Sequence, residues 1–285
     1  MKESRDLWQA HWIAAPAALF LWWFATGILL WRVHRADRGD ADQHLNSVLY
    51  SLPLLVLGGY GVAHSLDDTG RFGVWVAFLS AMMIWAWAEL AFLSGVITGP
   101  NKAPCPQGLD GQGRFRAAFL AVAWHELLLA LALAVLAYAS KGAENSFAFW
   151  TFAVLFAARI SAKLNLFLGV PRINVHFLPK PISHLASYFR TGPITAFFPV
   201  SVTLLALGLG CFLERLMAAH SAQTQGALLG FLLLSILTAL ALLEHWFMVW
   251  RFRDDRLWSW MIGPAARRRA HTVETTITKR TEHGL

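Results

Sequence analysis

The sequence predicts an all-α integral membrane protein, a bundle of about seven transmembrane helices with one or two interfacial helices. Of its 285 residues, 56% are hydrophobic and 14% are charged, whereas soluble domains average about 45–50% apolar and about 25% charged residues. Seven apolar stretches each reach the length of about 20 residues that a helix needs to cross a bilayer. The 14 Trp residues are typical of a chain that meets two membrane–water boundaries.

The predicted spans form one polytopic domain, residues 12–262. A tail of residues 1–11 precedes it, and a polar, basic tail of residues 263–285 follows it. The spans are 12–31, 48–66, 73–97, 117–139, 147–168, 196–213 and 227–250. They contain no repeat, and no separate soluble domain is predicted.

Helix-breaking and small residues mark two of these spans. Pro53 and a glycine cluster (Gly58, Gly59 and Gly61) make the second span the least regular. Such residues are tolerated in lipid where neighbouring helices pack closely. Gly226 and Gly230 form a GxxxG-like pair at the start of the seventh span, and we interpret this pair as a close helix contact too.

The distribution of Lys and Arg predicts the orientation. With seven spans, one side of the membrane receives 17 of these residues, and the other receives Lys2, Arg5, Arg71, Lys141 and Arg215. Cytoplasmic loops carry the excess of positive charge. We therefore expect a bacterial inner-membrane protein with a periplasmic N-terminus and a cytoplasmic C-terminus. The net charge of +7 then reflects topology, and no nucleic-acid partner is predicted.

The long cytoplasmic loop 169–195 predicts an interfacial helix. Pro181 can start this helix, and Gly192-Pro193 can end it. An apolar face repeats at i, i+3, i+4 and i+7, formed by Ile182, Leu185, Ala186 and Phe189. We expect this face to lie flat on the inner membrane surface. The apolar segment 257–262 is expected to lie there as well.

Ionisable residues inside the predicted spans are the candidates for function. Each costs about 2.5–3.5 kcal/mol on insertion scales, so each needs a structural or functional reason. At about 1.5 Å per residue, their positions place them in one layer, about 8–12 Å below the cytoplasmic boundary. The candidates, with one neighbouring amide, are Glu89, His125, Glu126, Arg159, Lys163, Glu244, His245 and Asn165.

Three interpretations of this layer remain open from the residues alone. Three carboxylates, two cations and two imidazoles can form an internal ion-pair network that lowers the cost of burial. They can also bind a pigment, with a His as ligand to the magnesium of a chlorophyll-type ring and the cations holding its carboxyl or carbonyl groups. Catalysis by a bound metal is the least supported, because di-iron bundles use Glu-x-x-His spacing, whereas His125-Glu126 and Glu244-His245 are adjacent. No metal ligand is assigned.

Several of these residues belong to a set of runs that resembles a known family. The runs occur in order at residues 92–95, 98–100, 105–106, 125–127, 159–165, 167–171, 185–190, 198–201 and 244–247. Together they resemble the PuhE family, photosynthetic complex assembly protein 2, of anoxygenic phototrophic bacteria. The resemblance covers roughly residues 12–262 and carries no agreed catalytic residues.

The resemblance implies an inner-membrane factor that helps to assemble the photosynthetic reaction centre and influences bacteriochlorophyll supply. Its expected partners are the lipid bilayer and reaction-centre subunits or other assembly factors. Bacteriochlorophyll or a precursor is the expected ligand, and we expect no catalytic turnover. Two alternatives stay open, a membrane-bound enzyme of tetrapyrrole metabolism that uses the Glu/His layer, and a pigment carrier.

Overall fold

The prediction of seven membrane-spanning helices is confirmed by the computed structural model, which describes residues 2–40, 42–175 and 178–250. Within these residues, seven helical spans are long and apolar enough to cross a membrane. The chain is therefore a multi-pass, all-helical membrane protein. The helices are α1 (Lys2–Ala36), α2 (Gln43–Tyr50), α3 (Leu52–Ser65), α4 (Arg71–Leu93), α5 (Gly111–Ala139), α6 (Phe147–Leu168), α7 (Phe197–Ser221) and α8 (Gln225–Phe247).

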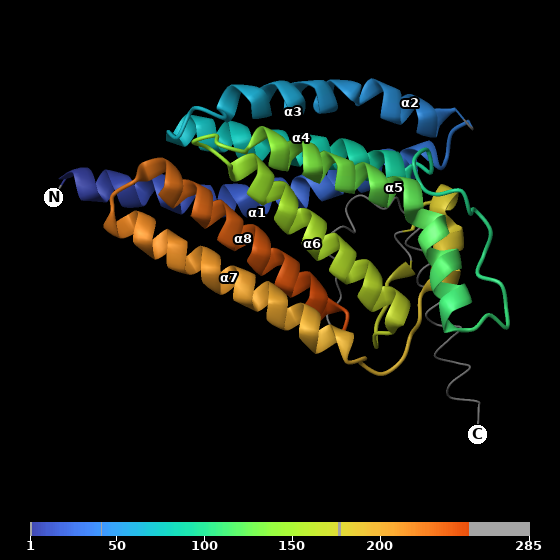
Figure 1. Cartoon of the computed structure of the whole chain (residues 1–285). Coiled ribbons are helices and arrows are strands. Elements are labelled where there is room, and N and C mark those ends of the chain that lie inside the picture. Colours follow the sequence, from blue (N-terminus) through green and yellow to red (C-terminus); the bar gives the residue numbers. More distant parts are fainter. Residues whose placement is uncertain (1, 41, 176–177, 251–285) are drawn as a thin grey trace.

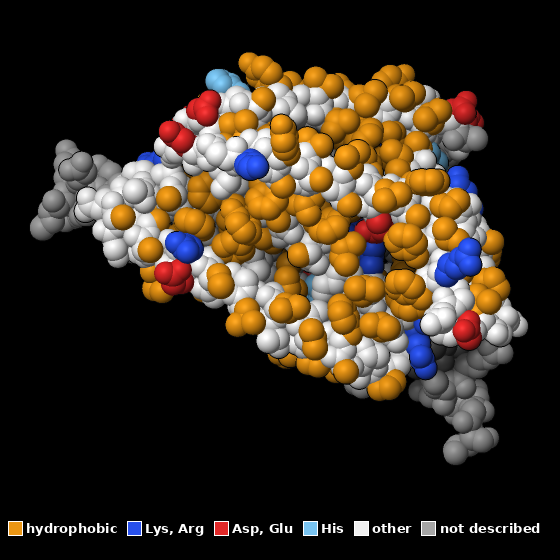
Figure 2. All heavy atoms as spheres, viewed as in Figure 1, with side chains coloured by type: hydrophobic (Ala, Val, Ile, Leu, Met, Phe, Trp, Pro, Cys, Tyr) orange, Lys and Arg blue, Asp and Glu red, His pale blue; other side chains and the backbone are white. Residues whose placement is uncertain are grey.

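Two of the helices form the centre of the bundle, and the others surround them. α4 and α8 are the most buried spans, and both pack against α1 and α6. α7 lies alongside α8, and α2 and α3 lie on the outer side of α4 (Figure 1). Hydrophobic side chains cover most of the face seen in Figure 2, as contact with lipid requires.

The second span is two helices in succession, as its irregular sequence suggests. α2 ends and α3 begins at Ser51, and Pro53 occupies the first turn of α3, where its missing N–H costs least. Gly58 and Gly61 then allow close contact with α4, because a Cβ at Gly61 would overlap the hydroxyl of Ser80. The predicted close packing of the glycine cluster is therefore present, except at Gly59, which faces open space.

A bend in α5 shapes the end of the bundle that carries the polar layer (Figure 1). The loop after α4 lies against α5, where the backbone N–H of His125 donates to the carbonyl of Thr98 at 2.9 Å. The N–H of Asn101 donates to the carbonyl of Leu120 at 3.2 Å. Groups that enter the hydrogen-bond ladder of a helix bend it. Beyond this bend, the N-terminal part of α5 contacts the last turn of α6, where the ring centroids of Phe115 and Phe167 lie 5.8 Å apart.

The predicted interfacial helix exists, but its predicted surroundings are wrong. It is a 3₁₀ helix, η2 (Lys180–Tyr188), in which every third residue shares a face. Its buried face is therefore Ile182, Leu185 and Tyr188. These side chains pack with Phe92 of α4 and Ala121 of α5, so the face covers protein instead of the membrane surface.

Some boundaries and segments differ from the prediction. α1 begins at Lys2 and so includes most of the predicted N-terminal tail. α7 continues to Ser221, past the predicted end at residue 213, with charged side chains of Glu214 and Arg215 exposed. The predicted interfacial segment 257–262 and the basic tail 263–285 lie outside the described residues.

Candidate functional site

Three of the predicted layer residues meet between α4, α5 and α6. Arg159 donates to the carboxylate of Glu89 at 2.7 Å. The Nε2 atom of His125 lies 3.7 Å from the other oxygen of Glu89, and its ring stacks on Phe92 with centroids 4.3 Å apart. The Glu89 side chain is 9% exposed and that of His125 is fully buried. Burial of the Glu89 carboxylate is thus offset by a cation on a neighbouring helix.

A second buried ion pair lies beside the first. Lys163 on α6 donates to the carboxylate of Glu126 on α5. Lys163 also lies over the ring of Phe92, 4.7 Å from its centroid. Glu126 and its neighbour His125 therefore face different partners, as expected from the angle of about 100° between adjacent helical residues.

Two further candidate residues, His245 and Asn165, make separate contacts. His245 pairs with the hydroxyl of Ser161 at 2.8 Å and with the carbonyl of Ala241 at 2.7 Å. Asn165 donates to the hydroxyl of Ser201 on α7 at 2.9 Å. Both side chains are buried, and both link neighbouring helices. Both ring nitrogens of His245 and the amide nitrogen of Asn165 are therefore used within the bundle, whereas the amide oxygen of Asn165 is buried without a partner among the described residues.

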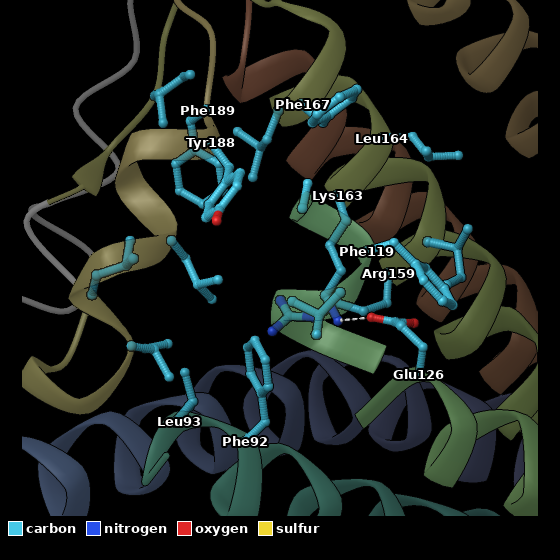
Figure 3. A pocket seen from close by; sticks show the side chains of 18 of the residues that line it. Phe92, Leu93, Phe119, Glu126, Arg159, Lys163, Leu164, Phe167, Tyr188 and Phe189 are labelled. Carbon is cyan, nitrogen blue, oxygen red and sulfur yellow. Dashed lines mark hydrogen bonds and ion pairs between the residues drawn. The ribbon is translucent and has the colours of Figure 1, made fainter. Parts of the chain in front are cut away.

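An apolar cavity of about 420 Å³ opens between α5, α6 and η2. We call it the η2 cavity. Its walls include Phe115, Phe119, Phe167, Tyr188 and Phe189, and its charged residues are Glu126, Arg159 and Lys163. Figure 3 shows Arg159 and Lys163 reaching from α6 into this space, with Glu126 beside Lys163. The bend in α5 and the packing of η2 together form this cavity. A hollow with acidic and basic side chains is visible in the apolar face in Figure 2.

A smaller cavity of about 250 Å³ lies between α1, α4, α6 and α8, and we call it the α8 cavity. Glu244 lines this cavity with Glu89, and it hydrogen-bonds with Trp22 of α1. Arg159 lines both cavities. The charged residues of the predicted layer are therefore divided between two cavities, and Arg159 is shared by them.

The aromatic wall of the η2 cavity was not predicted from the ionisable residues of the sequence. Phe115 and Phe119 lie one turn apart on α5, a spacing that could have identified them. Arg114 was also missed. It donates to the carbonyls of Phe167 at 2.9 Å and Tyr188 at 2.6 Å, and so it joins the ends of α5 and α6 to η2.

The arrangement suits binding of an apolar molecule that carries a polar group. Ligand pockets typically measure about 300–1,000 Å³ and combine apolar walls with a few polar groups. Within the described residues, no group of three or more His, Cys, Asp or Glu side chains could hold a metal ion. His125 and His245 line neither of these two cavities.

Comparison with known proteins places the chain in a family. An uncharacterized 30.4 kDa protein in the puhA 5′ region of Rhodobacter capsulatus is 50% identical over 269 residues, which cover 94% of this chain and 97% of the relative. No solved structure matches. Residues 8–269 match the family model DUF3623, described as a protein of unknown function. The chain therefore belongs to the DUF3623 family.

Proposed function

We propose that the protein is an inner-membrane factor that assists assembly of the photosynthetic reaction centre by holding bacteriochlorophyll or a precursor in the η2 cavity. The observation that carries the proposal is the cavity itself, an aromatic space of about 420 Å³ with two cations inside it. Aromatic walls suit a flat conjugated ring. Arg and Lys supply donors for its carbonyl or carboxyl groups.

Two further observations support a photosynthetic role. The runs at residues 159–165 and 185–190, which contribute to the resemblance to the PuhE family, include residues that line the cavity. The name of the Rhodobacter capsulatus relative places its gene in the 5′ region of puhA, which agrees with a role related to photosynthesis. Reaction-centre subunits or other assembly factors are the proposed partners.

The structure changes which residues we assign to the proposed site. Glu126, Arg159 and Lys163 line the η2 cavity and are proposed to contact the ligand. His125 and Glu89 are proposed as positioning residues, because they orient Arg159 and Phe92 from behind the cavity wall. His245 and Asn165 are proposed to serve helix packing. Glu244 belongs to the α8 cavity.

Purification and complementation test the proposal together. The protein, isolated in mild detergent from a pigment-producing phototroph, is expected to carry bacteriochlorin absorption, and Phe119→Trp is expected to reduce it by filling the cavity. A strain that lacks the gene is expected to accumulate less reaction centre, with recovery on complementation. Normal reaction-centre levels in that strain, or a colourless wild-type protein, would count against the proposal.

A further inference from the structure

The η2 cavity and the α8 cavity differ in the sign of their charged linings. The η2 cavity has two cations, Arg159 and Lys163, and one carboxylate, Glu126. The α8 cavity has the shared Arg159 with two carboxylates, Glu89 and Glu244. The lining of the η2 cavity therefore has one more cation than carboxylates, and the carboxylate that pairs with Arg159, Glu89, lines the α8 cavity instead. Where the numbers of cations and carboxylates differ, the resulting electrostatic potential is stronger inside a wall of low dielectric constant than it would be in water.

Arg159 also retains an unused hydrogen-bond donor, because its buried Nε has no partner among the described residues. Among the described residues, Arg159 donates to Glu89, and Lys163 donates to Glu126. A guanidinium and an ammonium each carry several N–H donors and no acceptor. Donors left without acceptors in an apolar space are costly, and a carboxylate, which only accepts hydrogen bonds, satisfies them.

We infer that the η2 cavity binds an apolar ligand through a free carboxylate, held by Arg159 and Lys163, and that it discriminates against the ester of the same ligand. The carboxylate of the ligand is inferred from the residues that line the cavity. The identity of the rest of the ligand as a tetrapyrrole rests on the proposed function. The expected ligand is thus an unesterified magnesium tetrapyrrole with a free propionate.

The position of the cations explains why an ester is excluded. Arg159 lines both the η2 cavity and the α8 cavity, and it is paired with Glu89, which lines the α8 cavity. An ester would remove the negative charge and direct an apolar alcohol group at this ion pair. Charge-assisted hydrogen bonds are stronger than neutral ones, so we expect the acid to bind about 10-fold to 100-fold more tightly than the ester.

The test compares ligands that differ only at the carboxyl group. The purified full-length protein in lipid nanodiscs is titrated with a magnesium bacteriochlorin bearing a free propionate, with its methyl ester, and with palmitate. Because Lys163→Gln alone leaves Glu126 buried without a cation, the variant is the double change Lys163→Gln and Glu126→Gln. Arg116→Gln is the matched control, since Arg116 is exposed and lines neither cavity.

Each outcome distinguishes the inference from the proposed function. Preference for the acid in the wild type and in Arg116→Gln, lost in the double variant, supports the inference. Equal affinity for acid and ester overturns it and leaves the proposed function intact. Binding of palmitate without either bacteriochlorin supports a carboxylate site and overturns the proposed pigment ligand. Absence of binding by all three ligands overturns both.

Discussion

The ammonium of Lys163 on α6 pairs with the carboxylate of Glu126 on α5, and both side chains line the η2 cavity. The pair is mostly buried, with side chains 21% and 12% exposed, respectively. It joins α5 and α6, which also meet where Phe115 packs against Phe167. One contact therefore links two walls of the cavity and includes two of its three charged side chains.

Removal of one member of this pair is expected to destabilise the protein. Lys163→Met leaves the Glu126 carboxylate without its cation, a change that typically costs about 3–5 kcal/mol for a buried pair. Abundance in membranes and thermal stability in detergent should fall, and adding Glu126→Gln should restore part of both. Lys141→Met, at an exposed position, is the control. Equal abundance of all single variants would show that the pair has no structural role.

The buried imidazole of His125 gives a second prediction. His125→Gln loses the stacking on Phe92 and leaves an amide in a fully buried site, so it should lower stability by about 1–3 kcal/mol. Because His125 lines neither cavity, the absorption maximum of any bound pigment should stay unchanged. A shifted maximum, measured on the purified variant, would instead identify His125 as a ligand to the pigment.

The close approach at the start of α8 gives a third prediction. A Cβ at Gly226 would overlap the backbone carbonyl of Thr69, which cannot move as a side chain can. Gly226→Ala should therefore destabilise the protein by about 1–3 kcal/mol, the usual cost of overpacking. Gly210→Ala on α7 is the control, because a Cβ there meets nothing within 4 Å and Ala favours helix. The measurement is the thermal unfolding of both variants in the same detergent, which compares the stability of Gly226→Ala with that of Gly210→Ala.

The excess of cations on one side of the membrane predicts the orientation. A reporter that is active only in the periplasm should be active when fused after Lys141, between α5 and α6. It should be inactive when fused after Arg172 or after Gly263. These fusions probe both sides of the bundle, and activity at all three positions would contradict the seven-span topology.

The sequence by itself determined the class of protein, the number of spans and the residues that need partners inside the bundle. These properties are local, because lipid requires about 20 apolar residues for each span and penalises every charge within it. For this reason Glu89, Glu126, Arg159 and Lys163 could be identified from their positions alone. The break before Pro53 was likewise predictable from residue type. Of the GxxxG-like pair, Gly230 contacts Phe147 of α6, whereas Gly226 approaches the loop at Thr69 instead of a helix.

Only the tertiary structure decided how those residues are paired and what space they enclose. Arg159 meets Glu89, and Lys163 meets Glu126, because side-chain directions depend on how three helices are rotated against one another. The loop at Thr98 bends α5 through backbone contacts with residues 19 and 27 positions further along the chain. The 3₁₀ geometry of η2 then selects the face that closes the cavity. None of these long-range contacts is encoded in the periodicity of a single helix, so the division into two cavities at Arg159 emerges only in the folded bundle.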